Sequence, residues 1–415
     1  MLALEATTSA ISYIALALLV GQLVAAGFLF PQGQAATLRM SLFDWARASL
    51  VLFLFAAFLA LLVQGGKLQR GLPSAEILWR YLRMTQSGKI WLVRELYGFA
   101  LFLGMWALRK KHVSRKIFWL LIILTLPLVS ARSLTSHAAA VRDDTAIAVI
   151  ADATHLIATA LWAGGLVALW RIFYLYYRNS DLSPALVAHI VNRFSYLALG
   201  SVFFLSATGA YQSWIHVGSI NNLFNTQYGN VLVLKLAIFL AMLAFGALNF
   251  LSTKPQLSRI AITNVPLCHV SQRALKRIGT ESLLGLSILS VTGWLTVLPP
   301  GVHALHQAAA TKNAVSTAPA AKLAPAEGAS VKILSPAPEQ AFAGDKVPLK
   351  FALNTGKRGT HVHAYIDGEL MGMFESKQGT LNGIAPGRHT LELRVVAEDH
   401  QTELDATDRV EFNVK

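Results

Sequence analysis

Residues 9–30 read SAISYIALALLVGQLVAAGFLF, a stretch of apolar and small residues that contains no charged side chain. A run of about 20 apolar residues is long enough to cross the hydrocarbon core of a bilayer. Within lipid, a single segment can satisfy its own backbone hydrogen bonds only as an α-helix. The stretch therefore predicts a transmembrane helix, and comparable runs recur along the chain.

About eight such runs lie before residue 300, near residues 9–30, 44–64, 93–109, 116–137, 145–173, 193–216, 230–252 and 278–298. The chain has 415 residues, of which 54% are hydrophobic and 14% are charged. A soluble globular chain carries about 25% charged residues. We therefore expect residues 1–300 to form an all-α polytopic membrane bundle of about eight transmembrane helices.

The net charge of +14 would suggest nucleic-acid binding in a soluble protein, but here it is a topology signal. Basic residues gather in the loops at 109–116, 171–193 and 254–277, whereas the loop at 217–230 has no Lys or Arg. Such loops stay in the cytoplasm, so both termini should lie outside it. The basic stretch at 67–89 disagrees with this pattern. Because it mixes Trp, Leu and Tyr with Arg, we expect an interfacial helix there.

The composition changes after residue 300. Residues 301–330 are rich in Ala, Pro, Ser and Thr, which is typical of a flexible linker. Residues 331–415 alternate apolar and polar side chains in about seven short segments, separated by turn pairs such as Asp367-Gly368. This pattern predicts an all-β immunoglobulin-like sandwich. Its expected core residues are Phe351, Ile366, Leu391, Leu393 and Phe412.

Ionisable side chains within membrane spans are costly and indicate function. Asp152 and His155 are three residues apart in the fifth span, so they share one helix face. We also expect His137, His216 and Lys235 on the outer side of their spans. Carboxylate and neutral imidazole can bind a metal ion or a proton. The alternative is that His216 and Lys235 merely sit in the interfacial region.

The β domain has its own candidates. His361 and His363 alternate along one strand, so both point to one face, while Val362, Ala364 and Ile366 point to the core. Met371 and Met373 follow on the next segment, and imidazole with thioether suits copper, especially Cu(I). The alternative is that these side chains face solvent and bind nothing. Two weaker candidate ligand pairs are His303 with His306 and Cys268 with His269.

Several segments together resemble the copper resistance D (CopD) family of bacterial inner-membrane proteins. They are SLTSHAA at 133–139, DATHLIATALWAGGLVAL at 152–169, RFSYLALGSVFFLSATGAY at 193–211, QYGNVLVLKLAIFLAMLAFGALN at 227–249 and RALKRIGTESLLGLSILSVTGWLTVLPP at 273–300. The resemblance covers residues 90–300 well and the first two spans loosely. The family's GHA-like histidine corresponds to His137, with Ser136 in place of the usual Gly, and its span-five histidine corresponds to His155.

The resemblance implies copper ion transport across the bacterial inner membrane, with both termini periplasmic and copper as the bound metal. A periplasmic copper carrier or a membrane complex is the expected partner, beside membrane lipid, and no enzyme activity is expected. Some family members carry a fused periplasmic copper-binding domain, so the resemblance leaves the role of the C-terminal sandwich open.

Two other functions remain compatible with the sequence. His137 and His155 on neighbouring spans could be axial ligands of a b-type haem in a redox protein. The chain could instead be a non-transporting subunit or an assembly factor of a metalloenzyme complex. The sequence has no P-loop motif, so nothing in it resembles an ATPase.

Overall fold

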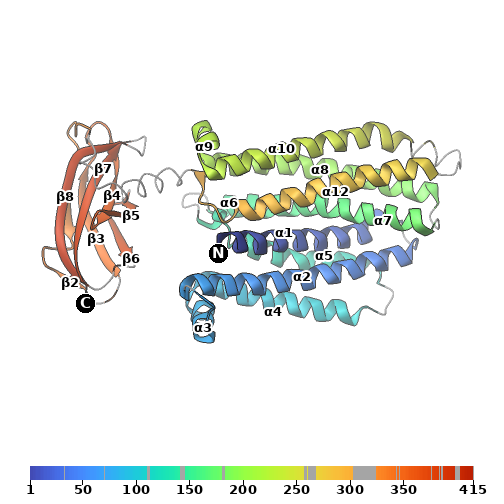
Figure 1. The fold of residues 1–415 in the computed structure, drawn as a ribbon, viewed down its shortest axis with the longest axis horizontal. Coiled ribbons are helices and arrows are strands. Elements are labelled where there is room, and N and C mark those ends of the chain that lie inside the picture. The colour runs from blue at the N-terminus through green and yellow to red at the C-terminus, as the bar shows by residue number, and fades with distance from the viewer. Residues whose placement is uncertain are drawn as a thin grey trace. The chain divides into compact units, whose positions relative to one another are not determined.

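The computed structural model describes residues 1–31, 33–69, 71–109, 113–140, 145–179, 183–256, 259, 268–301, 324–342, 344, 346–374, 376–382, 384, 387–397 and 402–414. The chain divides into two compact units, Met1–Val302 and His303–Lys415. The described residues of the first unit are mainly helical, and those of the second form β-strands (Figure 1).

The helical unit confirms the expected membrane bundle, since eight described helices are long and apolar enough to span a bilayer. Its elements are α1 Leu2–Val24, η1 Ala25–Leu29, α2 Ala36–Gln69, α3 Ala75–Met84, α4 Gln86–Ala107, α5 Arg115–Ser133, η2 His137–Ala140, α6 Thr145–Thr159, η3 Ala160–Gly164, α7 Gly165–Asn179, α8 Pro184–Val217, α9 Ile220–Asn225, α10 Gln227–Leu248, η4 Asn249–Thr253 and α12 Cys268–Leu295. Three of the short segments, η1, η3 and η4, are π-helical. The long helices run alternately up and down, so loops gather at the two ends of the bundle (Figure 1).

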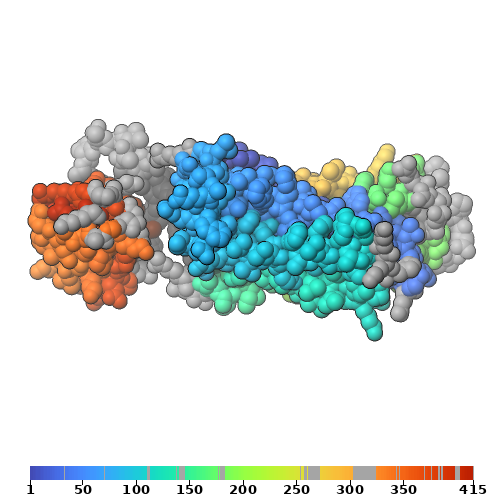
Figure 2. Space-filling view, turned by 90° about the horizontal axis from the view of Figure 1, so that it is seen from below, coloured from blue at the N-terminus to red at the C-terminus, as the bar shows by residue number. Residues whose placement is uncertain are grey.

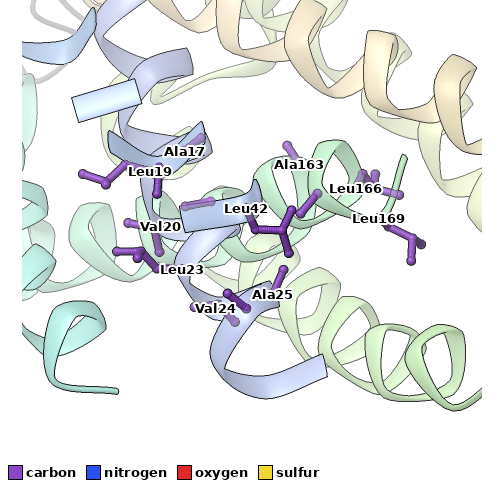
Figure 3. Packing of buried hydrophobic residues seen from close by; sticks show 14 of the residues in the cluster. Ala17, Leu19, Val20, Leu23, Val24, Ala25, Leu42, Ala163, Leu166 and Leu169 are labelled. Atoms are coloured by element: carbon purple, nitrogen blue, oxygen red, sulfur yellow. The ribbon is translucent and has the colours of Figure 1, made fainter. Parts of the chain in front are cut away.

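Helix α1 forms the centre of the bundle, where 78% of the residues in its most apolar stretch are buried. Figure 3 shows its apolar side chains meeting those of α2, η3 and α7. Gly21 and Gly164 make this crossing possible, because a Cβ on Gly21 would lie 2.3 Å from the Gly164 carbonyl carbon. Small residues let membrane helices approach closely, and the two glycines have this role where α1 crosses the fifth span.

Three arginines from other helices make hydrogen bonds with the end of the first span, in η1. Arg39, Arg115 and Arg193 donate to the backbone carbonyls of Ala26, Gly27 and Phe28. The final carbonyls of a helix lack partners within it and carry partial negative charge, so guanidinium groups stabilise them. These arginines belong to the bundle end that the sequence predicts to be cytoplasmic.

The surface of the bundle is apolar, as lipid contact requires. Helices α2 and α4 lie on one face of the unit (Figure 2), and both expose large side chains such as Phe55 and Phe99. The predicted interfacial segment forms α3, which lies crosswise at the end of α2 and α4 (Figure 1). Its position at a membrane surface stays a prediction.

The β unit is a sandwich of two sheets around one core. Its strands are β1 Ser330–Ser335, β2 Ala341–Phe342, β3 Lys346–Asn354, β4 Gly359–Ile366, β5 Glu369–Phe374, β6 Gln378–Asn382, β7 Gly387–Ala397 and β8 Glu403–Val414. One sheet has the order β1-β3-β6 and the other β2-β8-β7-β4-β5. The predicted core is confirmed, since the five residues named for it are at most 6% exposed.

The predicted turn at Asp367-Gly368 connects β4 with β5. Both residues have positive φ, 51° for Asp367 and 87° for Gly368. This conformation suits a two-residue hairpin, because its twist matches the twist of the flanking strands. The turn thereby places β5 beside the strand that carries His361 and His363.

Candidate functional site

The fifth span is the continuous helix α6–η3–α7, which bears Asp152 and His155 on α6. The π-helical segment η3 begins five residues after His155, and such segments are frequent at functional sites. The two side chains share a helix face, yet they make hydrogen bonds with different parts of the bundle.

His155 is held by helix α8. Its Nδ1 atom lies 2.9 Å from the Thr208 hydroxyl oxygen, and that hydroxyl donates its proton to the Phe204 carbonyl at 2.6 Å. Thr208 must therefore accept the hydrogen bond, so the His155 ring carries its proton on Nδ1. The Nε2 atom is then the unprotonated nitrogen, which is the form that binds a metal ion.

Asp152 faces the connection between α5 and α6. The Ser136 hydroxyl donates to its Oδ2 atom at 3.1 Å. Arg132 at the end of α5 and Lys235 on α10 both interact electrostatically with the carboxyl group. These contacts place a potential negative charge between two basic groups near the predicted outer end of the bundle.

A cavity of about 470 Å³ lies beside His155. Residues from α6, η3, α8, α10 and α12 line it, and most of its wall is apolar. The polar side chains on the wall include His155, Thr159, Gln212, Tyr228 and Lys235. The Gln212 Nε2 atom is buried without a hydrogen-bond partner in the part of the chain that the structure describes.

The structure brings together part of the predicted outer cluster. His155 and Lys235 line the same cavity, and Lys235 is coupled electrostatically to Asp152. His216 is buried and stacks edge-on against Tyr228, with ring centroids 6.5 Å apart. It therefore contacts a residue of the cavity wall. His137 begins η2, but its side chain lies outside the described residues.

Several polar residues of the bundle were not predicted from the sequence as candidate site residues. Glu281 is buried in α12, where its carboxylate accepts a hydrogen bond from Asn249 at 2.8 Å. The signal was available, because Glu281 is the lone acidic residue in an apolar run. Thr208 and Gln212 gave no comparable signal, since uncharged polar side chains are common on membrane helices.

In the β unit, His361 and His363 share one face as predicted, but neither is exposed to solvent. They are 2% and 4% exposed, and their Nε2 atoms are 3.3 Å apart. Glu403 on β8 accepts hydrogen bonds from His363 and Tyr365. Burial opposes ionisation of Glu403, but the hydrogen bonds from His363, Tyr365 and Arg394 outweigh it and lower its pKa to about 2.

The two methionines of β5 do not lie on the same face of the sheet. Met373 is registered opposite His363, whereas the pairing shifts by one residue between Ala364 and Tyr365. Met371 lies at this irregularity and packs against the core. A bulge changes the side to which one residue points, so the period-two expectation holds for Met373 alone.

Among the described residues, no three His, Cys, Asp or Glu side chains lie together in a group that could hold a metal ion. The two weaker candidate pairs are not among these described side chains. His303 and His306 lie outside the described residues, as do the side chains of Cys268 and His269.

Two family models match the helical unit. The model of the copper resistance protein D-like N-terminal domain matches residues 3–147, and that of copper resistance protein D matches residues 188–295. The chain belongs to the copper resistance protein D family. The CopD resemblance and the membrane-helix prediction are thereby confirmed, and the matches extend over the first two spans as well.

The chain is also similar to a protein of Bacillus subtilis (strain 168), "Copper transport protein CutJ". The two sequences are 30% identical over 238 residues, which is 56% of this chain and 41% of the relative. The chain thus spans less than half the length of that relative.

Among solved structures, 20% of the chain is similar to 46% of a chain from "Structures of Clostridium thermocellum CbhA fibronectin(III)-like modules". The sequence identity is 19% and the TM-score is 0.18.

Proposed function

We propose that the helical unit moves copper ions across the bacterial inner membrane, with copper entering from the periplasmic side. The observation that supports this proposal best is His155 on the wall of the membrane cavity, with its proton held on Nδ1 by Thr208. Its Nε2 atom can therefore bind a metal ion without first losing a proton.

The charges around the cavity suit a site that a cation enters and leaves. Asp152 attracts a cation, whereas Lys235 opposes one and is coupled electrostatically to both Asp152 and His155. A single imidazole with a partly balanced carboxylate binds copper weakly compared with a closed set of ligands. Weak binding suits passage, because an ion that must cross has to be released.

The proposed orientation of the bundle in the membrane rests on the distribution of basic residues. The bundle end that carries Arg109, Arg115 and Arg193 would face the cytoplasm, and both ends of the chain would be periplasmic. A reporter fused after Lys415 that is active only in the periplasm supports this orientation. Activity only in the cytoplasm would overturn it.

Copper accumulation in cells tests the proposal, measured per molecule of membrane-inserted protein. We expect His155→Leu to reduce accumulation at least tenfold, because Leu offers no ligand yet fits a membrane helix. Asp152→Asn should reduce it less, since it removes charge but no nitrogen ligand. The matched control is His189→Leu, which replaces an exposed histidine on α8.

Normal accumulation by His155→Leu would refute the transport site. An absorption spectrum of the purified protein distinguishes copper transport from the main alternative, which is haem binding. A Soret band lost in His155→Leu would show that the histidine binds haem and not a copper cargo.

A further inference from the structure

A buried carboxyl group lies in the helical unit toward the predicted cytoplasmic end, and the proposed transport site does not use it. Glu281 on α12 is 4% exposed, and the Asn249 amide of η4 donates a hydrogen bond to its Oε2 atom at 2.8 Å. Among the described residues, this carboxyl group has no ion-pair partner. An ionised carboxylate at membrane depth is costly without a cation beside it, so Glu281 should hold a proton at rest.

Helix α10 and segment η4 leave room for this carboxyl group in both of its protonation states. A Cβ on Gly246 would lie only 3.2 Å from Glu281 Oε1, so a glycine at this position makes space for the oxygen. The side-chain amide of Asn249 contains a donor and an acceptor. It can therefore donate to an ionised carboxylate or accept from a protonated carboxyl group.

The cavity beside His155 comes within one helical turn of Glu281. Gly285 lies four residues further along α12, Met242 lies four residues before Gly246 on α10, and both line the cavity. A Cβ on Gly285 would lie 3.4 Å from the Met242 Cε atom, so these two residues meet at the cavity wall. The Met242 thioether is a soft donor that suits Cu(I). A copper ion that leaves the cavity past Met242 therefore approaches Glu281.

The other titratable groups near α12 make their described contacts with other residues. The elements packed against α12 are α1, α7, η3, α10 and η4. On α12 itself, Arg277 is one turn from Glu281 and donates to the Ser252 hydroxyl at 2.7 Å. The side chains of Tyr176 and Arg178 lie outside the described residues. The remaining contacts are Glu5 with Lys67, Tyr13 with Arg132, Arg171 with Trp45, Tyr174 with Trp170, Tyr177 with Gln272, Tyr228 with His216, Lys235 with Asp152 and Lys254 with Phe250.

We propose that Glu281 is a proton–cation exchange site next to the cavity, an inference that rests on the proposed function of the helical unit. Copper(I) that arrives past Met242 displaces the carboxyl proton, and this proton leaves toward the bundle end formed by η4 and the start of α12. One positive charge replaces another, so the net charge of the buried site stays the same and no electron is transferred. Glu281 takes up a proton again when copper has left.

Infrared difference spectroscopy of the purified full-length protein tests the exchange, with copper(I) added under anaerobic reducing conditions. The C=O stretch of a protonated carboxyl group should disappear when copper(I) binds. Glu281→Gln should lack this change. Glu281→Asp should show it at a shifted frequency, which covers the case in which the Gln variant fails to fold.

The matched control is Glu95→Gln, which should keep the infrared change, because Glu95 belongs to α4 and pairs there with Arg94. The same copper-induced change in wild type and Glu281→Gln, or no carboxyl change in the wild type, would overturn the proposal.

Copper(I) uptake into proteoliposomes separates the exchange from the proposed function. One proton competes with one cation, so wild-type uptake at low copper concentration should rise by up to about tenfold per pH unit. Glu281→Gln should transport with a weaker pH dependence, and any effect of pH on His155 is common to both proteins. An unchanged pH dependence in Glu281→Gln overturns the exchange alone. If the wild type does not transport at any pH, the proposed function fails, and the infrared change still decides whether copper displaces the Glu281 proton.

Discussion

The polar side chains of the two units are arranged differently: they are dispersed in the helical unit and connected in the β unit. In the helical unit, Asp152 and His155 make hydrogen bonds with different partners, and His155 lines a cavity together with Lys235 from another helix. In the β unit, His361, His363, Tyr365 and Arg394 converge on one sheet face, where Glu403 links the last three. The helical unit thus leaves polar groups facing a cavity, whereas the β unit joins its polar groups to one another.

The largest effect is expected where the helical unit is packed most closely. Gly164→Leu should prevent folding of this unit, because a Cβ at Gly164 would lie 2.0 Å from the Ala17 carbonyl oxygen. The cost should reach or exceed the about 1–3 kcal/mol typical of overpacking. Tryptophan fluorescence during thermal unfolding reports on this unit alone, since the last of the nine Trp is Trp294.

The control is Gly104→Leu, because a Cβ at Gly104 has no atom within 4 Å. If both variants unfold at the wild-type temperature, the crossing of α1 and η3 is not what stabilises the bundle.

The β unit should be independent of this crossing. Residues 324–415 expressed alone should unfold cooperatively, and Leu393→Ala should lower the free energy of unfolding by about 2–5 kcal/mol, because Leu393 is fully buried. Denaturant unfolding followed by circular dichroism measures the change. Leu334→Ala, at a residue that is 60% exposed, should cost far less. A fragment without a cooperative transition would show that the β unit needs the rest of the chain.

A moderate effect is expected from the group that orients His155. Thr208→Val removes the acceptor for His155 Nδ1, and loss of such a partner costs about 10–100-fold in metal affinity or activity. Copper accumulation should therefore fall, but less than in His155→Leu. Thr292→Val makes the same exchange on α12, where the hydroxyl bonds its own helix. Equal copper accumulation by both Thr variants would mean that transport does not depend on the hydrogen bond between His155 and Thr208.

The smallest effect is expected at the exposed hairpin of the β unit. Burial slightly opposes ionisation of Asp367, but hydrogen bonds from the Thr390 amide and His389 outweigh it and lower its pKa. Its contribution is thus present above the unfolded pKa of about 3.9 and is lost as the pH falls below it. Exposed pairs contribute about 0–1 kcal/mol.

Asp367→Asn should accordingly lower the stability of residues 324–415 at neutral pH, and the difference from wild type should shrink in acid. Urea unfolding at a series of pH values measures it, with Asp405→Asn on β8 as an exposed control. A difference in the free energy of unfolding that grows in acid would contradict the lowered pKa of Asp367.

The helices and strands, and the faces that they bury, follow from patterns in the amino-acid sequence. Apolar runs of spanning length have one solution in lipid, so the eight helices followed from composition and length. Alternation along residues 359–366 likewise placed Val362 and Ala364 in the core, because the side-chain period of a strand is two. The Asp367-Gly368 turn followed from the φ angles that those residues tolerate.

Which side chains contact one another depends instead on how the helices and strands pack. Periodicity places Asp152 and His155 on one face of a helix, but not the neighbours opposite it, which are Ser136 and Thr208. The register shift between Ala364 and Tyr365 places Met371 against the core and leaves Met373 opposite His363. Local rules fix the direction of a side chain within its own element, whereas its partners depend on how separate elements pack, and that information is spread over the whole chain.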